Sequence, residues 1–180
     1  YLDSGHVVET DRSGMVSPYQ GETPKMVDRL CEKALGGILF IDEAYTLAPL
    51  NRSGEYDSQG TQALEKLMKR MEDDRNKFVV ILAGYRMEMD NLFRVNPGFR
   101  SRFNYFLNIE DYSPEELFNI LLAFAKEKKY ILSEQAELLV RDKIKEMYEQ
   151  RDKDFANGRT MRLLFDSICK NQAQRLECSN

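Results

Sequence analysis

The sequence has no stretch long enough to cross a membrane. Its continuous apolar runs, such as residues 38–41 and 78–83, have the length of strands, whereas a helix that spans a bilayer requires about 20 apolar residues. The first six residues contain neither the basic segment nor the apolar segment of a secretion signal. From these absences we expect no membrane association and a cytoplasmic location.

Cysteine is scarce, and the three that occur form no metal or redox motif. Cys31, Cys169 and Cys178 show no CxxC spacing. Cys31 and Cys169 fall on the apolar faces of expected helices, where cysteine acts as a small packing residue. We therefore expect free thiols in a reducing compartment.

A cationic stripe is missing as well. The chain has 26 Lys and Arg against 30 Asp and Glu, a net charge of −4, with the two signs interspersed. Because a nucleic-acid groove requires clustered basic residues, this balance argues against nucleic-acid binding.

Strands and helices alternate along residues 1–111. The expected strands are residues 6–10, 38–41, 78–83 and 105–109, with helices between them. Residues 14–21 read as a polar loop, and Thr23 is expected to cap the first helix, with Pro24 at its first position. The pattern predicts a parallel α/β sheet with strands covered on both faces and a ligand at their carboxyl ends.

Residues 112–180 read as entirely helical. Ser113 and Glu116 have the spacing of a capping box, and Ser133 is expected to cap a second helix whose buried face includes Leu139. A last helix opens at Arg159. The change of character predicts a boundary between residues 111 and 112.

The strongest functional signal is an apolar strand that ends in two acidic residues, Asp42 and Glu43. In nucleotide hydrolysis an acid at such a position holds Mg²⁺ through its water shell, and a second acid polarises the attacking water. The alternative is that the pair only begins a solvated loop.

Arginines further along favour the first interpretation. Residues 96–102 (NPGFRSR) place Arg100 and Arg102 after an expected turn, and Arg159 follows Asn157 and Gly158 at a helix start. Together with residues 36–45 (GGILFIDEAY) and 82–85 (LAGY), this order resembles the AAA+ ATPase branch of the red-type Rubisco activase CbbX and stage V sporulation protein K. The type VII secretion ATPase EccA carries a similar module.

The resemblance covers residues 7–176 and implies an AAA+ P-loop-type parallel sheet, present in part, followed by a small helical lid. It implies ATP and Mg²⁺ as cofactors. Asp42 would lie on the Mg²⁺ side of the nucleotide, and Glu43 would be the catalytic base. Tyr85 falls at the position called sensor 1, where many AAA+ proteins have Asn.

The resemblance also assigns the arginines. Arg102, with Arg100 as second choice, would be the arginine finger that reaches the γ-phosphate of a neighbouring subunit. Arg159 would be sensor 2, contacting the phosphates from the lid, with Arg162 as a weaker candidate. Because a cation at a helix start opposes the helix dipole, we expect Arg159 to have an anionic partner.

Residues 18–23 (PYQGET) resemble the aromatic–any–Gly pore loop of AAA+ translocases. Tyr19, followed by Gly21, would grip an extended peptide in the channel of a ring. The alternative is that Tyr19 packs against its own domain. Residues 51–56 are a candidate for a second pore loop by position only.

A phosphate-binding loop G-x-x-x-x-G-K-[ST] is absent: of the ten glycines, none precedes a lysine. In the family this loop lies just upstream of the segment that begins at residue 1, so we expect truncation rather than a degenerate member. Without the loop's amides and lysine, this polypeptide alone is not expected to bind ATP tightly.

Three functions follow from the resemblance. The first is a ring-forming, hexameric ATPase that remodels or translocates a protein substrate, and this is the function we favour. The second is a nucleotide-inactive interaction or scaffold module with the same fold. The third is a DNA-handling AAA+ protein, against which the acidic balance speaks.

Overall fold

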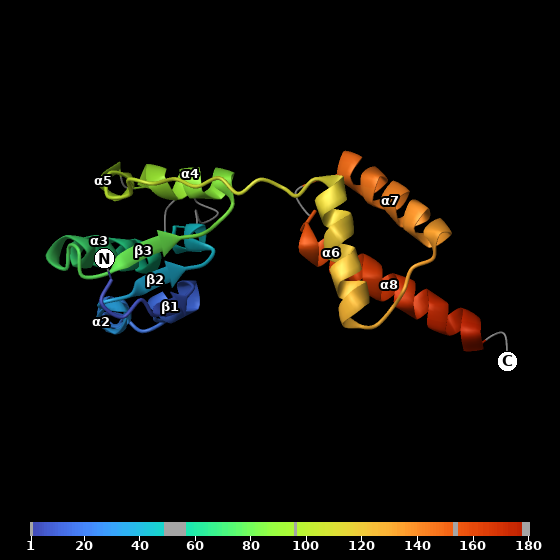
Figure 1. Ribbon diagram of the computed structural model, residues 1–180. Helices are drawn as coiled ribbons and strands as arrows, with labels where there is room; N and C mark the ends of the chain where they lie inside the picture. Colours follow the sequence, from blue (N-terminus) through green and yellow to red (C-terminus); the bar gives the residue numbers. More distant parts are fainter. Residues whose placement is uncertain (1, 49–56, 96, 153–154, 178–180) are drawn as a thin grey trace. The chain divides into compact units, whose positions relative to one another are not determined.

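The computed structural model describes residues 2–48, 57–95, 97–152 and 155–177 (Figure 1). The chain divides into two compact units, Tyr1–Phe106 and Leu107–Asn180. Within the described part, no helix has the combination of length and apolar character needed to cross a membrane.

The first unit is built on a three-stranded parallel sheet with the order β1-β2-β3. Its strands are β1 (Val7–Thr10), β2 (Ile38–Ile41) and β3 (Val79–Leu82). Ile38 pairs with Val7 on one side and with Val79 on the other. The predicted parallel sheet is confirmed, and the strand that precedes the acid pair is its central strand.

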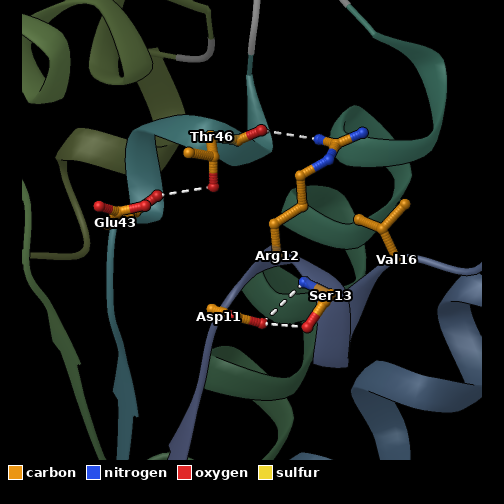
Figure 2. Close-up of a pocket in the computed structure, with 6 residues that line it drawn as sticks. All are labelled: Asp11, Arg12, Ser13, Val16, Glu43 and Thr46. Carbon is orange, nitrogen blue, oxygen red and sulfur yellow. Dashed lines mark hydrogen bonds between the residues drawn. The ribbon is translucent and has the colours of Figure 1, made fainter.

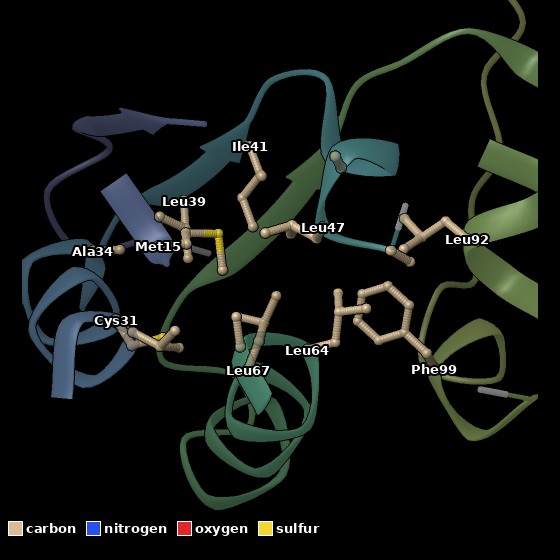
Figure 3. Packing of buried hydrophobic residues seen from close by; sticks show 14 of the residues in the cluster. Met15, Cys31, Ala34, Leu39, Ile41, Leu47, Leu64, Leu67, Leu92 and Phe99 are labelled. Atoms are coloured by element: carbon tan, nitrogen blue, oxygen red, sulfur yellow. The ribbon is translucent and has the colours of Figure 1, made fainter. Parts of the chain in front are cut away.

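Two helices, α2 (Thr23–Ala34) and α3 (Ser58–Asp73), supply the core that lies against this sheet. Figure 3 shows Leu39 and Ile41 of β2 directed toward Leu64 and Leu67 of α3, and all four side chains are buried. Burial of these apolar surfaces is the main force that holds the layers together.

The prediction that both apolar strands are covered on both faces is wrong for β3. Val79 and Ile81 are exposed, while Val80 and Leu82 between them are half-buried and pack on the core. Alternate residues of a strand point to opposite faces. One face of β3 is therefore open among the described residues, because α2 and α3 pack on the other.

Residues 14–21 were expected to form a loop, but the short helix α1 (Arg12–Met15) overlaps their start. Asp11 caps α1 by accepting hydrogen bonds from the backbone N–H groups of Ser13 and Gly14, and Met15 is fully buried. A local cap and one apolar anchor are enough to order this short segment.

The predicted helix start at Thr23 is correct, but Thr23 is the first residue of α2, which Glu22 precedes as the cap. The Thr23 side chain is buried. Its Oγ1 accepts a hydrogen bond from the Ser17 N–H and donates one to Gln59 Oε1. The hydroxyl therefore fixes the loop before α2 instead of capping the helix.

The arginine-bearing segment is helical where a turn was expected. Helix α4 (Arg86–Val95) is followed by the short helix α5 (Pro97–Arg100). Phe99 of α5 is fully buried, with its ring centroid 6.0 Å from that of Phe93 and 5.1 Å from that of Phe103. This aromatic cluster draws the segment onto the core.

The strand predicted at residues 105–109 is not present. Residues 103–113 belong to no helix or strand, and Tyr105, Leu107 and Ile109 are almost fully exposed. A strand requires a neighbour for its backbone hydrogen bonds, and none of the described strands pairs with this segment.

The second unit consists of α6 (Pro114–Glu127), α7 (Glu134–Glu149) and α8 (Gly158–Glu177). The capping box of Ser113 and Glu116 and the Ser133 cap are confirmed. The buried core of this unit is Leu117, Phe118, Leu121, Ala125, Val140, Ile144, Met161 and Phe165.

The expectation that Leu139 faces inward is wrong, because its side chain is 71% exposed. Val140 and Ile144 lie one turn apart and face the core. A neighbouring position on a helix points about 100° away, and this rotation carries Leu139 out to solvent.

Candidate functional site

Asp42 and Glu43 follow β2 directly, at the carboxyl edge of the sheet. The Asp42 N–H donates to the Thr10 carbonyl at 2.8 Å, and the Ala83 N–H donates to the Ile41 carbonyl at 2.9 Å. The acid pair is therefore level with the ends of both neighbouring strands. In open parallel sheets this edge is where ligands bind.

Glu43 has an unusual backbone conformation. Its φ of 46° and ψ of 42° lie in the left-handed region, which costs a non-glycine residue roughly 1 to 3 kcal/mol. Its carbonyl accepts hydrogen bonds from the Thr46 N–H at 2.9 Å and from Thr46 Oγ1 at 2.7 Å. The Ala44 N–H donates to the Ala83 carbonyl at 3.0 Å. These contacts hold the short 3₁₀ helix η1 (Ala44–Leu47), and Glu43 before it, in place.

The carboxylates of this pair are exposed. One Asp42 oxygen, Oδ1, accepts a hydrogen bond from the Glu43 N–H at 2.9 Å. The second oxygen of Asp42 and both oxygens of Glu43 have no protein partner among the described residues. Carboxylate oxygens at the end of a strand are suitable ligands for a hard cation and can accept hydrogen bonds from water.

An open hollow of about 340 Å³ lies beside Glu43. Figure 2 shows its lining residues. They come from α1 and its cap, from Val16, and from residues 42–47 after β2, which we call the acid loop. The hydrogen bond from the Ser13 side chain, followed by that from the Gly14 N–H, holds the pKa of Asp11 below its ordinary value. Asp11 is thus ionised and adds negative charge to this side of the sheet.

Tyr85, three residues beyond the end of β3, lies close to the acid loop. Its ring centroid is 6.1 Å from that of Tyr45, and the Tyr85 side chain is 66% exposed. Gly84 permits this approach, since a Cβ there would lie 2.8 Å from Tyr45 Cδ1. Desolvation, reinforced by the charge of Glu43, raises the pKa of Tyr45. Its phenol therefore stays neutral at physiological pH.

The two candidate finger arginines are both exposed but are held differently. The Arg100 guanidinium lies 4.6 Å from the centroid of the Phe106 ring and 5.6 Å from that of Phe93. Arg102 donates from Nη1 to the Gly98 carbonyl at 2.7 Å. Neither side chain is buried in the core of its own unit.

The candidate pore loop forms a turn that presents Tyr19 to solvent. The Tyr19 side chain is 74% exposed, its N–H donates to Ser17 Oγ at 3.1 Å, and Gly21 has a φ of +79°. Such a φ favours glycine. The other candidate, residues 51–56, lies outside the described residues.

The second unit carries Arg159 and Arg162 on α8. Arg159 is exposed. No ion pair joins its guanidinium to a protein carboxylate among the described residues, and an anionic partner such as a phosphate stays a prediction. Arg162 lies with its guanidinium carbon 4.5 Å from the centroid of the Phe124 ring. The start of α8 is fixed by Asn157, which accepts from the Tyr112 N–H and donates to Asp111.

Sequence reasoning missed Arg12, Asp11 and Tyr45. Asp11 had a usable signal, because an Asp two residues before a Ser after a strand is a common local cap. Arg12 and Tyr45 act through contacts with residues distant in sequence. No local pattern marks contacts of that kind.

Residues 3–111 match the ATPase family associated with various cellular activities (AAA), and residues 113–180 match the AAA lid domain. The chain belongs to the AAA ATPase family. Its parallel sheet with flanking helices and the helical unit that follows agree with this fold.

Within the family the chain lies in the CbbX and stage V sporulation protein K branch, as its motifs indicated. It is 40% identical over 176 residues to stage V sporulation protein K of Bacillus subtilis (strain 168), covering 97% of this chain and 53% of that protein. It is 39% identical to protein CbbX of Cereibacter sphaeroides, covering 98% and 55%. It is 36% identical to the chloroplastic ribulose bisphosphate carboxylase/oxygenase activase of Cyanidioschyzon merolae, covering 98% and 58%. The chain thus spans about half the length of these relatives.

Proposed function

We propose that the chain is part of an ATP-hydrolysing AAA+ ring protein that remodels or translocates a protein substrate through a central pore. The observation that supports this best is the position of Asp42 and Glu43 at the carboxyl end of the central strand. One relative is named as an activase of another enzyme, and this supports a protein client here.

The acid pair supplies the chemistry. Mg²⁺ is usually held by one or two carboxylates together with phosphate oxygens and water, so the donor set of Asp42 fits it. Bound with ATP, Mg²⁺ would neutralise charge on the phosphates. Glu43 orients and polarises the attacking water as the general base. Tyr85 supports this loop through its ring contact with Tyr45.

Cations complete the proposed site. Arg159 contributes to phosphate binding from the lid, with Arg162 as a supporting residue held on Phe124. Arg102, or in second place Arg100, serves the γ-phosphate site of an adjoining protomer in a hexameric ring. A positive charge supplied across a subunit boundary stabilises the transition state. The proposed subdomains are residues 1–111 and 112–180.

The client contacts the exposed Tyr19 beside Gly21, in the channel of the ring. A flat aromatic side chain has few rotamers to lose and a large surface to offer. The protein is proposed to act in the cytoplasm, without membrane or nucleic-acid partners.

ATP hydrolysis by the full-length protein tests the proposal. Glu43→Gln removes the base while keeping the shape of the side chain, so we expect kcat to fall by about a hundredfold or more with ATP still bound. An unchanged kcat would contradict the assignment of Glu43. The 180-residue chain contains no phosphate loop, and calorimetry with ATP is expected to show no tight binding to it alone.

The alternative is a nucleotide-inactive interaction or scaffold module with the same fold. The same assay separates the two functions. A full-length protein that neither binds nor hydrolyses ATP would support the scaffold and contradict the motor.

A further inference from the structure

Arg12 ties the acid loop to the start of another helix. Its Nη1 donates to the Thr46 carbonyl at 2.7 Å (Figure 2), and its Nη2 donates to Asp57 Oδ2 at 2.7 Å. Asp57 is the cap of α3. One guanidinium therefore connects two elements that lie 34 and 45 residues away along the chain.

The tie leads directly to Glu43. Thr46, whose carbonyl Arg12 holds, donates from both its N–H and its Oγ1 to the Glu43 carbonyl. The strained left-handed conformation of Glu43 therefore depends on a residue that Arg12 fixes. A strained conformation persists only where its surroundings enforce it.

The start of α3 holds the loop from the other side. A Cβ on Gly60 would lie only 1.8 Å from the Leu47 carbonyl oxygen, so η1 packs directly on the α3 backbone. Burial raises the pKa of Asp57, but the hydrogen bonds from Arg12 and the Gly60 N–H outweigh this and keep it below its ordinary value. Asp57 is thus an ionised anchor.

We propose that Arg12 is a positioning residue for ATP hydrolysis, which bridges Thr46 to Asp57 and thereby holds the Glu43 loop in its catalytic conformation. This inference rests on the proposed ATPase function and deepens it. Arg12 acts through the backbone of the loop and through Glu43. Its loss therefore affects the chemical step and spares nucleotide binding.

The test uses the full-length protein and two readouts. In Arg12→Gln, kcat is expected to fall about ten- to a hundredfold, because a small misplacement of a catalytic group has an effect of that size, while KM for ATP stays within about twofold. Arg12→Lys keeps the positive charge but offers one donor nitrogen in place of the two that Arg12 uses. It is expected to recover part of kcat. Hydrogen exchange of the backbone amides of residues 44–48 is expected to be faster in Arg12→Gln than in wild type.

Arg75→Gln is the matched control. Arg75 is exposed, and within the described part of the chain its ion pair is with Glu72, so kcat, KM and amide exchange are expected to be unchanged. Gly60→Ala, whose Cβ would press on both the Leu47 carbonyl and Arg12 Nη1, is expected to repeat the fall in kcat.

Hydrogen exchange separates the possible failures. If wild type hydrolyses no ATP, the proposed function fails, whereas unchanged exchange at residues 44–48 in Arg12→Gln overturns the role of Arg12 whatever the activity. The role of Arg12 would also be overturned if Arg12→Gln and Arg12→Lys were both globally unfolded and both showed a rise in KM in proportion to the fall in kcat.

Discussion

The rings of Tyr45 and Tyr85 lie 6.1 Å apart at an interplanar angle of 45°. Tyr45 follows Glu43 by two residues in η1, and Tyr85 follows β3. The contact joins the loops at the ends of two adjacent strands. The contact thus places the Tyr85 ring beside the residues that follow Glu43.

If Tyr85 acts through this ring contact, its hydroxyl is dispensable. Tyr85→Phe is expected to keep most of the ATPase activity of the full-length protein. Tyr85→Ala is expected to lower kcat about three- to tenfold, which corresponds to the loss of one aromatic pair. Steady-state kinetics measures both. Equal losses in Phe and Ala variants would instead show that the phenol oxygen acts on the nucleotide or on water.

The arginine finger can be tested by mixing inactive subunits. Arg102→Ala and Glu43→Gln are each expected to abolish hydrolysis in a uniform ring. In rings assembled from both, a site with an intact Glu43 can meet an intact Arg102 on its neighbour, so about a quarter of the activity is expected to return. Recovery appears only if the two residues serve one site from different subunits.

An Arg102 that acted within its own subunit would give no recovery, because every subunit would lack one of the two residues. The same mixing experiment with Arg100→Ala in place of Arg102→Ala is the comparison. The Arg100 guanidinium is held on the rings of Phe93 and Phe106. We therefore expect the complementation to depend on Arg102 and not on Arg100.

The central part of the site could be predicted because its signals are contiguous. An apolar run followed at once by Asp42 and Glu43 specifies the strand and the place of two carboxylates at its end. The chemistry of the two carboxylates stays a prediction. The Ser113 cap was predictable for the same reason, since the cap and Glu116 lie within one helical turn.

Other features depend on partners that a local pattern does not contain. The alternating residues 105–109 are typical of a strand, yet a strand forms only beside another strand. The contact of Arg12 with Thr46 joins a side chain to a backbone carbonyl, and any residue type at position 46 offers that carbonyl. Sequence patterns carry no record of such a contact.

Burial of Cys31 predicts a loss of stability at alkaline pH. Desolvation raises the pKa of this thiol from 9.0 to about 11. The thiol ionises more readily in the unfolded chain, so its contribution to folding is complete below pH 9 and is lost as pH rises through 11. The loss is at most about 3 kcal/mol for a shift of this size.

Comparison with Cys31→Ala isolates this effect from other alkaline titrations. The variant leaves a small cavity and is expected to be less stable than wild type at pH 8. The difference in the free energy of unfolding is expected to shrink between pH 9 and pH 11. A difference that stays constant over this range would show that the thiol ionises equally in both states.

The exposure of Tyr19 predicts a functional loss without a loss of stability. Its ring is 74% exposed, and substitutions at such positions change the free energy of unfolding by less than about 0.5 kcal/mol. Tyr19→Ala is therefore expected to leave the melting temperature nearly unchanged and to lower the remodelling of a fluorescent unfolded protein at least tenfold. Tyr19→Phe is expected to keep most of the remodelling activity, because the surface of the ring makes the contact with the substrate. Tyr112→Ala, at a half-exposed tyrosine of the second unit, is the control and is expected to remodel normally. A fall in melting temperature in Tyr19→Ala, with remodelling and stability lost together, would mean that this side chain packs against its own domain.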